Sequence, residues 1–596
     1  MVPCVIFEDE HLLVVAKPAG WNTHAPSPHA GEGIYDWLKH REPRWAALAI
    51  IHRLDKETSG VLVFGKTPLA NKSLTEQFTT RAVRKKYLLL TDRKVPATEF
   101  AVKTTLARLG EKYASGPGGE VAETKFRRSR GDEAQNKIGS RQSAIGNQWE
   151  PPHIGGYERV EAEPFTGRTH QIRVHAAESG FPILGDTLYG GTAAARVYLH
   201  AAEIAFTHPA TREPVTFSAP ANFDANLEGG DTSPLSDEAT RRLVEKRGPV
   251  RALQTAAARL FAIRSAVIEP EAATAFRLIH GASDGWPGWF VEKLGDFLLS
   301  QADAPLSAQQ SEELSRLARQ FSARGAYHKI LSRHLRPATV ADASPQLVLG
   351  DAAPERFEIL ENGLRYELSF REGYSVGLFL DQRDNRRRLL AGHVAADFQL
   401  PTANCQFTAA THANAAGQIG NWQLAILNAF AYTCGFSVAA AKAGARTTSL
   451  DLSRKYLDWG RRNFALNGLD PAAHEFIYGD TFDWLRRLAK KGRAFDVIVL
   501  DPPTFSRSKE HGTFRADKDY GRLVTATLPV LKPGGVLLAS TNAADWPPES
   551  FLTDVATAVR AAKRKITRQH YVPQPPDFPV SRAEPAYLKT VWLQIK

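Results

Sequence analysis

The sequence predicts a multidomain protein whose C-terminal half contains a doubly wound, Rossmann-like α/β domain. The chain has 596 residues, which exceeds the size at which a single hydrophobic core stops growing. A polar, turn-rich stretch at residues 226–234 interrupts the apolar patterning, as a linker does. From residue 424 onward, short apolar runs alternate with helix-length amphipathic segments. This alternation is typical of βαβ units around a parallel sheet.

The composition is that of an ordinary globular protein, with 43% hydrophobic and 23% charged residues. A net charge of +11 favours a polyanionic partner such as RNA. No apolar run approaches the length of a membrane span, and the N-terminus lacks a secretory signal. The three cysteines form neither a disulfide framework nor a zinc-like CxxC pair. We therefore expect a cytosolic protein that contacts no membrane and binds no metal.

One segment of the N-terminal half, His52–Gly60, places a single carboxylate in a loop before a strand. Asp55 follows the basic pair His52 and Arg53 and precedes the apolar run at 61–64. A loop carboxylate next to a rigid strand has a fixed direction, which suits a nucleophile. The alternative is that Asp55 merely stabilises the turn that follows it.

Two more segments change the balance between these alternatives. Residues 77–87 and 167–175, taken together with 52–60 and in this order, resemble the motifs of RluA-type pseudouridine synthases. Residues 14–20 and 182–186 add supporting matches, and the likeness covers about residues 3–223. The resemblance implies a mixed α+β fold around an antiparallel sheet. It also implies isomerisation of uridine to pseudouridine in RNA without a cofactor.

The resemblance assigns roles to individual residues of this half. Asp55 is the catalytic carboxylate, and Arg173 is the cation that offsets the cost of burying it. Tyr87 stacks on the uracil of an everted nucleotide. His170 and His175 are expected to be packed imidazoles without a chemical role. Four basic residues are expected to bind RNA, chiefly through phosphates: Arg53, Arg81, Lys85 and Arg168.

In the C-terminal half, polar residues follow successive predicted strands. Asp451, after the second strand, suits hydrogen bonds to two ribose hydroxyls, and Asp480, after the third, suits an adenine edge. The turn after the first strand, at residues 428–437, would let backbone amides approach a cofactor. Each aspartate taken alone could instead be a loop or cap residue. As an ordered set, these features resemble class I S-adenosylmethionine-dependent methyltransferases.

The segment Asp501–Phe505 resembles the DPP-x-F motif of the RlmI and RlmK types of large-subunit rRNA methyltransferase. Residues 377–386 and 276–288 resemble other parts of that family, and the likeness spans about residues 255–596. It implies S-adenosylmethionine as cofactor. The predicted cofactor-binding residues are Asp381, Arg383, Asn428, Tyr432, Gly435, Asp451, Asp480 and Asp501. The predicted base-binding residues are Pro502, Pro503 and Phe505, of which Phe505 has core packing as its alternative.

One residue departs from the pattern of many such enzymes, which have two glycines in the first loop. Here Cys434 precedes the single Gly435, and Cys434 would be strained if the loop needs a positive φ at that position. Methylation at cytosine C5 needs a cysteine nucleophile, yet no thiol follows the fourth or fifth predicted strand. Cys434 and Cys405 are poorly placed for that role. We therefore favour a guanine ring nitrogen as methyl acceptor, since nitrogen needs alignment more than covalent activation.

The resulting hypothesis is a cytosolic enzyme that carries out two modifications of large-subunit rRNA. The alternatives are cytosine C5 methylation, a tRNA target, or a ribosome-assembly factor with one decayed active site. The predicted domains are a synthase at 1–223, a linker at 224–254, a small α+β domain at 255–370 and a methyltransferase at 371–596. Residues 126–156 are expected to be a surface loop, and residues 395–420 a poorly ordered loop. The sequence leaves the oligomeric state open.

Overall fold

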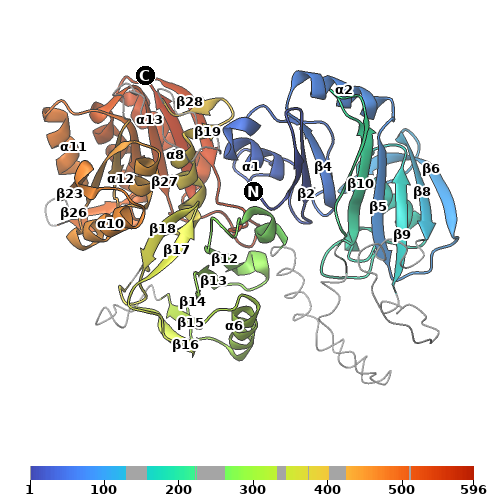
Figure 1. The fold of residues 1–596 in the computed structure, drawn as a ribbon, viewed down its shortest axis with the longest axis horizontal. Helices are drawn as coiled ribbons and strands as arrows, with labels where there is room; N and C mark the ends of the chain where they lie inside the picture. Colours follow the sequence, from blue (N-terminus) through green and yellow to red (C-terminus); the bar gives the residue numbers. More distant parts are fainter. Residues whose placement is uncertain are drawn as a thin grey trace. The chain divides into compact units, whose positions relative to one another are not determined.

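A computed structural model describes residues 2–128, 157–221, 223, 262–331, 344–373, 375–401, 424–508 and 512–596 (Figure 1). The chain divides into two compact units. The first comprises Met1–His24, Gly33–Tyr35 and Leu48–Val267. The second comprises Ala25–Glu32, Asp36–Ala47 and Ile268–Lys596. Among the described helices, none is long and apolar enough to cross a membrane.

The first unit is built on one sheet whose main path runs β1-β2-β4-β10-β5-β9-β8-β6-β7, with β3 added to β4 and β11 to β10. Its pairings are antiparallel except for the parallel pair β10–β4. This confirms the predicted mixed α+β fold. The strands are β1 (Val5–Glu8), β2 (Leu12–Lys17), β3 (Ala49–Ile50), β4 (Ser59–Gly65), β5 (Arg84–Thr91), β6 (Glu99–Leu109), β7 (Lys112–Ser115), β8 (Glu120–Arg128), β9 (Glu158–Pro164), β10 (Leu199–Thr207) and β11 (Pro214–Ser218).

Two helices cover parts of this sheet. Helix α2 (Pro68–Thr79) begins after Thr67, whose hydroxyl accepts a hydrogen bond from the Ala70 amide, and buries Leu74 against β2 and β4. Helix α3 (Gln171–Glu178) packs Ile172 against β5, β8 and β9. The loop before β4 and the start of α3 are therefore both anchored to the same rigid sheet.

The prediction of a surface loop at 126–156 is wrong for its first three residues, which belong to β8. Phe126 lies in β8 and is fully buried, because its ring packs against Phe100 and Phe181, with centroid distances of 5.5 and 5.2 Å. Arg127 and Arg128 complete that strand. Residues 129–156 of the expected loop lie outside the described part of the chain.

The second unit begins with a five-stranded sheet in the order β12-β13-β14-β15-β16. Leu314 and Leu317 of helix α6 (Ala308–Gln320) are buried in the core of this sheet. A hairpin, β17–β18, connects this part to the segment before the large parallel sheet. The bounds are β12 (Ala275–His280), β13 (Trp289–Leu294), β14 (Phe297–Ala302), β15 (Gly325–Ile330), β16 (Gln346–Gly350), β17 (Phe357–Glu361) and β18 (Leu364–Leu368).

The large sheet of the second unit has the order β23-β22-β21-β24-β27-β29-β28. Its first five strands are parallel, and β29 pairs antiparallel with both β27 and β28. This is the predicted doubly wound architecture, with the predicted strands in the predicted sequence positions. The bounds are β21 (Ala425–Ala429), β22 (Arg446–Asp451), β23 (Glu475–Tyr478), β24 (Phe495–Leu500), β27 (Leu531–Thr541), β28 (Ile566–Val572) and β29 (Lys589–Ile595).

Helices cover both faces of this sheet, because successive residues of a strand point to opposite sides. Ile498 and Leu500 of β24 face one core, while Val497 and Val499 face another. The first core includes side chains of α11 (Thr481–Lys490), α12 (Ala516–Thr527) and α13 (Pro548–Ala561). The opposite side is covered by α8 (Arg383–Ala391), α9 (Gly435–Lys442) and α10 (Arg454–Leu466).

The expected loop at 395–420 also begins too early. Ala395 ends the short strand β19 (His393–Ala395), and Phe398 lies in β20 (Phe398–Gln399); both are buried. They are buried because they pack against apolar residues of α8 and β21, including Leu389 and Ile426. Residues 402–423, with Cys405, lie outside the described residues.

Candidate active sites of the two units

In the first unit, Asp55 and Arg173 lie together. Asp55 sits in the loop before β4 and keeps 28% of its side chain exposed, whereas Arg173 on α3 is buried. Arg173 Nη1 lies 3.9 Å from Asp55 Oδ2. The other face of the guanidinium donates from Nε and Nη2 to the two oxygens of Asp186, at 2.7 and 2.8 Å. Asp186 thus aims the guanidinium at Asp55, a role that the sequence motifs did not reveal.

Burial opposes the charge of Arg173, but the hydrogen bonds and charge of Asp186 outweigh it and raise the pKa of Arg173. The guanidinium carbon also lies 5.0 Å from the centre of the Tyr189 ring, a cation–π distance. The cation is therefore permanent and held on two sides. A fixed positive charge favours an ionised carboxylate in a partly desolvated pocket.

Tyr87 on β5 belongs to the same group of side chains. Burial, and then the negative charge of Asp55, raise the pKa of the Tyr87 phenol. The phenol is therefore protonated at neutral pH and available as a hydrogen-bond donor. The structure thus brings Arg173 to Asp55 and places Tyr87 within the electrostatic influence of Asp55, although the sequence has them on three separate segments.

Lys17, at the end of β2, is a functional candidate that sequence reasoning did not single out. Its side chain is 1% exposed, and its ammonium donates to the carbonyl oxygens of Pro18, Trp21 and Lys56 at 3.0, 2.7 and 3.1 Å. Burial lowers the pKa of Lys17 to about 7, against the attraction of Glu57 and Asp55. Because Lys56 follows Asp55 directly, Lys17 ties the Asp55 loop to the sheet.

The four predicted RNA-binding residues occupy different surroundings. Arg53 and Arg81 are exposed. Arg168 donates from Nη1 to Glu120 Oε1 at 2.9 Å and from Nε to a backbone carbonyl. Lys85 is half-buried, with its pKa lowered by burial.

Both histidines of the third motif are packed imidazoles in the structure. His175 is buried between the hydroxyls of Thr104 and Thr124, at 3.0 and 2.9 Å. His170 shares a 2.8 Å hydrogen bond with the Tyr189 hydroxyl. Both ring nitrogens of His175 and Nδ1 of His170 are therefore engaged within the protein.

In the second unit, the first loop of the parallel sheet is held by Asp451. One Asp451 oxygen accepts from the Tyr432 amide and the other from the Ser453 amide, each at 2.8 Å. Phe430, Tyr432 and Cys434 all have positive φ, and Cys434 has φ 64°. The backbone does adopt the conformation that the sequence flagged as strained for cysteine. Its Sγ fills the space beside Gly460, where an added Cβ would lie only 2.3 Å away.

A second cluster lies at the carboxyl end of β24. Gln382 Nε2 donates to Asp501 Oδ1 at 3.1 Å and to Ser540 Oγ at 2.8 Å. Tyr587 donates its hydroxyl to Asp381 Oδ2 at 2.9 Å, and the buried Asp381 Oδ1 accepts no hydrogen bond from any residue that the structure describes. Burial, and then the charge of Asp381, raise the pKa of Asp501 to about 7.

Four other predicted cofactor residues make contacts within the protein. Arg383 donates to both oxygens of Asp577, at 2.9 and 2.6 Å, in a buried ion pair. Asp480 accepts from the amides of residues 482 and 483 at the start of α11, the cap alternative noted from sequence. Asn428 Nδ2 donates to Ser437, while the buried Asn428 Oδ1 has no partner in the described ranges. Gly435 begins α9, where an added Cβ would lie 2.9 Å from Leu378.

The predicted base-binding residues divide between the surface and the interior. Phe505 lies at the start of β25 (Phe505–Ser508), which pairs with β26 (Gly512–Arg515), and is 61% exposed. The core alternative for Phe505 is therefore wrong. Pro502 is buried, whereas Pro503 is exposed.

Comparison with known proteins yields two family matches. Residues 11–178 match the RNA pseudouridylate synthase model, and residues 423–593 match the S-adenosylmethionine-dependent methyltransferase model. A ribosomal RNA large subunit methyltransferase of Deinococcus radiodurans is 33% identical over 54% of this chain and 72% of its own length. The ribosomal RNA large subunit methyltransferase I of Aeromonas salmonicida is 32% identical over 55% of this chain and 76% of its own length. The solved structure named human RNA pseudouridylate synthase domain containing 1 aligns with 40% of this chain and 94% of its own, at 21% identity and a TM-score of 0.29.

The folds and the matches define an RNA-modifying enzyme in which a pseudouridine synthase domain precedes an S-adenosylmethionine-dependent methyltransferase domain. The chain belongs to the family of ribosomal RNA large subunit methyltransferases.

Proposed function

We propose that the chain modifies large-subunit ribosomal RNA at two bases in the cytosol, isomerising a uridine in the first unit and methylating a guanine ring nitrogen in the second. The names of the relatives of the second unit support the rRNA target. The net charge of +11 suits a polyanionic partner. The proposal divides the chain into a synthase domain at 1–223, a linker at 224–254, a small α+β domain at 255–370 and a methyltransferase domain at 371–596.

The 3.9 Å approach of Arg173 to Asp55 carries the assignment of the isomerase site. Isomerisation breaks the C1′–N1 bond of uridine and joins C1′ to C5, while the C5 proton is lost and N1 gains one. Asp55 acts on the everted nucleoside, and Arg173 keeps its carboxylate ionised. Tyr87 offers a protonated phenol and an aromatic face to the uracil. This half uses no cofactor, because the base supplies its own carbon nucleophile.

Arg53, Arg81, Lys85 and Arg168 hold phosphates near this site and read no sequence. A half-buried cation such as Lys85 regains solvation from a phosphate. We expect these contacts to set RNA affinity and its salt dependence rather than the rate of the chemical step.

In the second unit, S-adenosylmethionine supplies the methyl group. Each oxygen of Asp451 accepts one hydrogen bond from a backbone amide, which leaves lone pairs for ribose hydroxyls. Two buried oxygens that lack a partner among the described residues are further acceptors: that of Asn428 near the first loop and that of Asp381 near the end of β24. Tyr432, Gly435, Asp480 and Asp501 complete the proposed pocket. Arg383 serves it indirectly, by fixing the start of α8 through Asp577.

The buried state of Cys434 supports a nitrogen acceptor. Its side chain has no exposed surface, and burial raises the pKa of its thiol to about 12. A cysteine nucleophile needs a thiolate that can reach C6 of cytosine. Cys434 meets neither condition. Phe505 and Pro503 are exposed and suit stacking on the target base.

Nucleoside mass spectrometry of large-subunit rRNA from a deletion strain tests the proposal. Complementation with wild type should restore one pseudouridine and one methylguanosine. Asp55→Asn should restore only the methylguanosine, and Cys434→Ala should restore both. Full complementation by Asp55→Asn would instead identify an assembly factor. Loss of a methylcytosine from the rRNA of the deletion strain would support cytosine C5 methylation. Changes confined to tRNA would support a tRNA target.

A further inference from the structure

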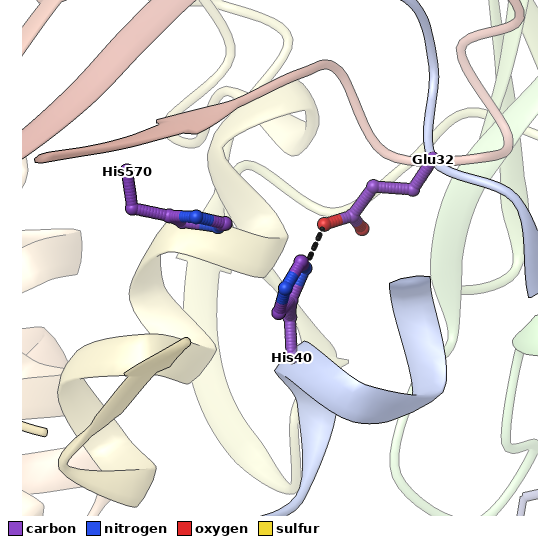
Figure 2. A group of neighbouring side chains, drawn as sticks. All are labelled: Glu32, His40 and His570. Atoms are coloured by element: carbon purple, nitrogen blue, oxygen red, sulfur yellow. Dashed lines mark hydrogen bonds and ion pairs between the residues drawn. The ribbon is translucent and has the colours of Figure 1, made fainter. Parts of the chain in front are cut away.

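Three side chains from distant parts of the sequence meet in the second unit. Glu32 and His40 come from the early segments Ala25–Glu32 and Asp36–Ala47 of that unit, and His570 lies on β28. One ligand atom from each residue lies within 4.8 Å of the other two (Figure 2). Figure 2 shows the His40 ring and the Glu32 carboxylate pointing at each other, with the His570 ring directed toward them.

Two of these side chains already have partners. His40 Nδ1 lies 2.7 Å from Glu32 Oε1, and the same oxygen lies 3.4 Å from Arg388 Nη2. The third side chain differs, since the buried His570 Nε2 has no hydrogen-bond partner among the described residues. The rings of His40 and His570 pack edge to face, with centroids 4.5 Å apart. A hydrogen-bonded His40–Glu32 pair alone does not explain a buried imidazole nitrogen left unsatisfied beside it.

We propose that Glu32, His40 and His570 bind a divalent transition metal ion, with zinc as the best match. Two imidazoles and one carboxylate are a ligand set that zinc accepts, with a fourth position open for water. Zinc–ligand distances of about 2.1 Å in a tetrahedral site place ligand atoms roughly 3.4 Å apart. Because the three atoms lie within 4.8 Å of one another, the widest pair needs to close by about 1.4 Å at most, which side-chain rotation provides.

The charges around the cluster define the affinity to expect. A metal ion coordinates the neutral form of an imidazole. Arg388 opposes a bound cation and competes for Glu32, whereas the Glu32 carboxylate favours the cation. His393 is engaged through Nε2 with the Lys39 carbonyl at 3.2 Å, and its buried Nδ1 has no partner within the described part of the chain.

Metal binding here would join the C-terminal end of α1 (Ile34–Arg41), which carries His40, to β28, the strand at one edge of the large sheet. The role is structural, because the cluster contains none of the residues assigned to methyl transfer. Zinc should therefore raise the stability of the chain by mass action without being needed for the chemical step.

Calorimetric titration of zinc chloride into the full-length, tag-free protein tests the proposal. Wild type should bind one zinc ion per chain, and magnesium chloride should give no heat of binding. Losing a ligand should weaken zinc binding by more than about tenfold in His40→Gln and in His570→Gln. The matched control is His474→Gln, which removes a half-buried histidine of the same unit that lies outside the cluster.

A second measurement keeps the test valid if a variant is destabilised. Circular dichroism and S-adenosylmethionine binding should show that each variant is folded before zinc is added, and the thermal midpoint with zinc should rise only in wild type and His474→Gln. Absence of stoichiometric zinc binding in wild type would overturn the proposal. Equal zinc affinity in His570→Gln and His474→Gln would overturn it as well.

Discussion

The carboxylate of Asp186 holds the guanidinium of Arg173 by two parallel hydrogen bonds, which leaves the third nitrogen 3.9 Å from Asp55. A bidentate pair of this kind fixes both position and orientation. The direction of the catalytic cation is therefore set by a residue that need not touch the RNA.

We expect Asp186→Asn to reduce the rate of pseudouridine formation by about 10²-fold, because a misplaced cation no longer faces Asp55. Methyl transfer should be unaffected. Single-turnover kinetics on the RNA substrate give the rate. Glu178→Gln is the control, because it alters a hydrogen-bonded carboxylate on α3, the helix that carries Arg173. Equal rates in the two variants would show that Arg173 is positioned without Asp186.

The lowered pKa of Lys17 leads us to expect that the stability of the surrounding strands depends on pH. Its folded pKa of about 7 lies below the ordinary value of 10.5, so between these pH values the unfolded state binds more protons. Relative to Lys17→Met, the unfolding free energy of wild type should therefore rise by about 1.4 kcal/mol per pH unit across that window. Hydrogen exchange of β2 and β4 measures it. Parallel profiles for the two proteins would contradict this expectation.

Glu361 and Arg386 form a buried ion pair, with distances of 2.5 and 2.7 Å. Glu361→Gln leaves the Arg386 charge buried without its counter-ion and should destabilise the second unit by about 3–5 kcal/mol. Glu313→Gln breaks the pair with Arg316 on the surface of α6 and should cost less than about 1 kcal/mol. Denaturant unfolding compares the two. Similar losses in both variants would argue against a special role for burial.

Asp501 predicts the opposite pH dependence from Lys17. Its folded pKa of about 7 exceeds the ordinary 3.8, so the folded state binds the extra proton between these values. The stability due to this group is complete at low pH and is lost as the pH rises toward 7. Asp501→Asn should remove a slope of about 1.4 kcal/mol per pH unit. Thermal unfolding without S-adenosylmethionine from pH 4.5 to 7 provides the test, and unchanged slopes would refute the assignment.

The sequence predicted the folds of both units because their signals are local. Alternating apolar runs and helix-length segments identified β21, β22, β23, β24 and β27. Three ordered motifs predicted that Asp55, Tyr87 and Arg173 share one site, and the structure places Arg173 3.9 Å from Asp55. The loop boundaries at 126 and 395 were wrong, because the burial of Phe126 and Phe398 depends on partners that are distant in the sequence.

By itself, the amino-acid sequence determined the two chemistries and the residues that resemble each family's motifs, since short spacings and strand periodicity encode them. Only the tertiary structure decided which polar groups pair. It joined Arg173 to Asp186, Lys17 to the Asp55 loop, Arg383 to Asp577, and Glu32 and His40 to His570. Buried polar atoms must find partners wherever the folded chain brings them. Those partners follow from packing, which no local pattern contains.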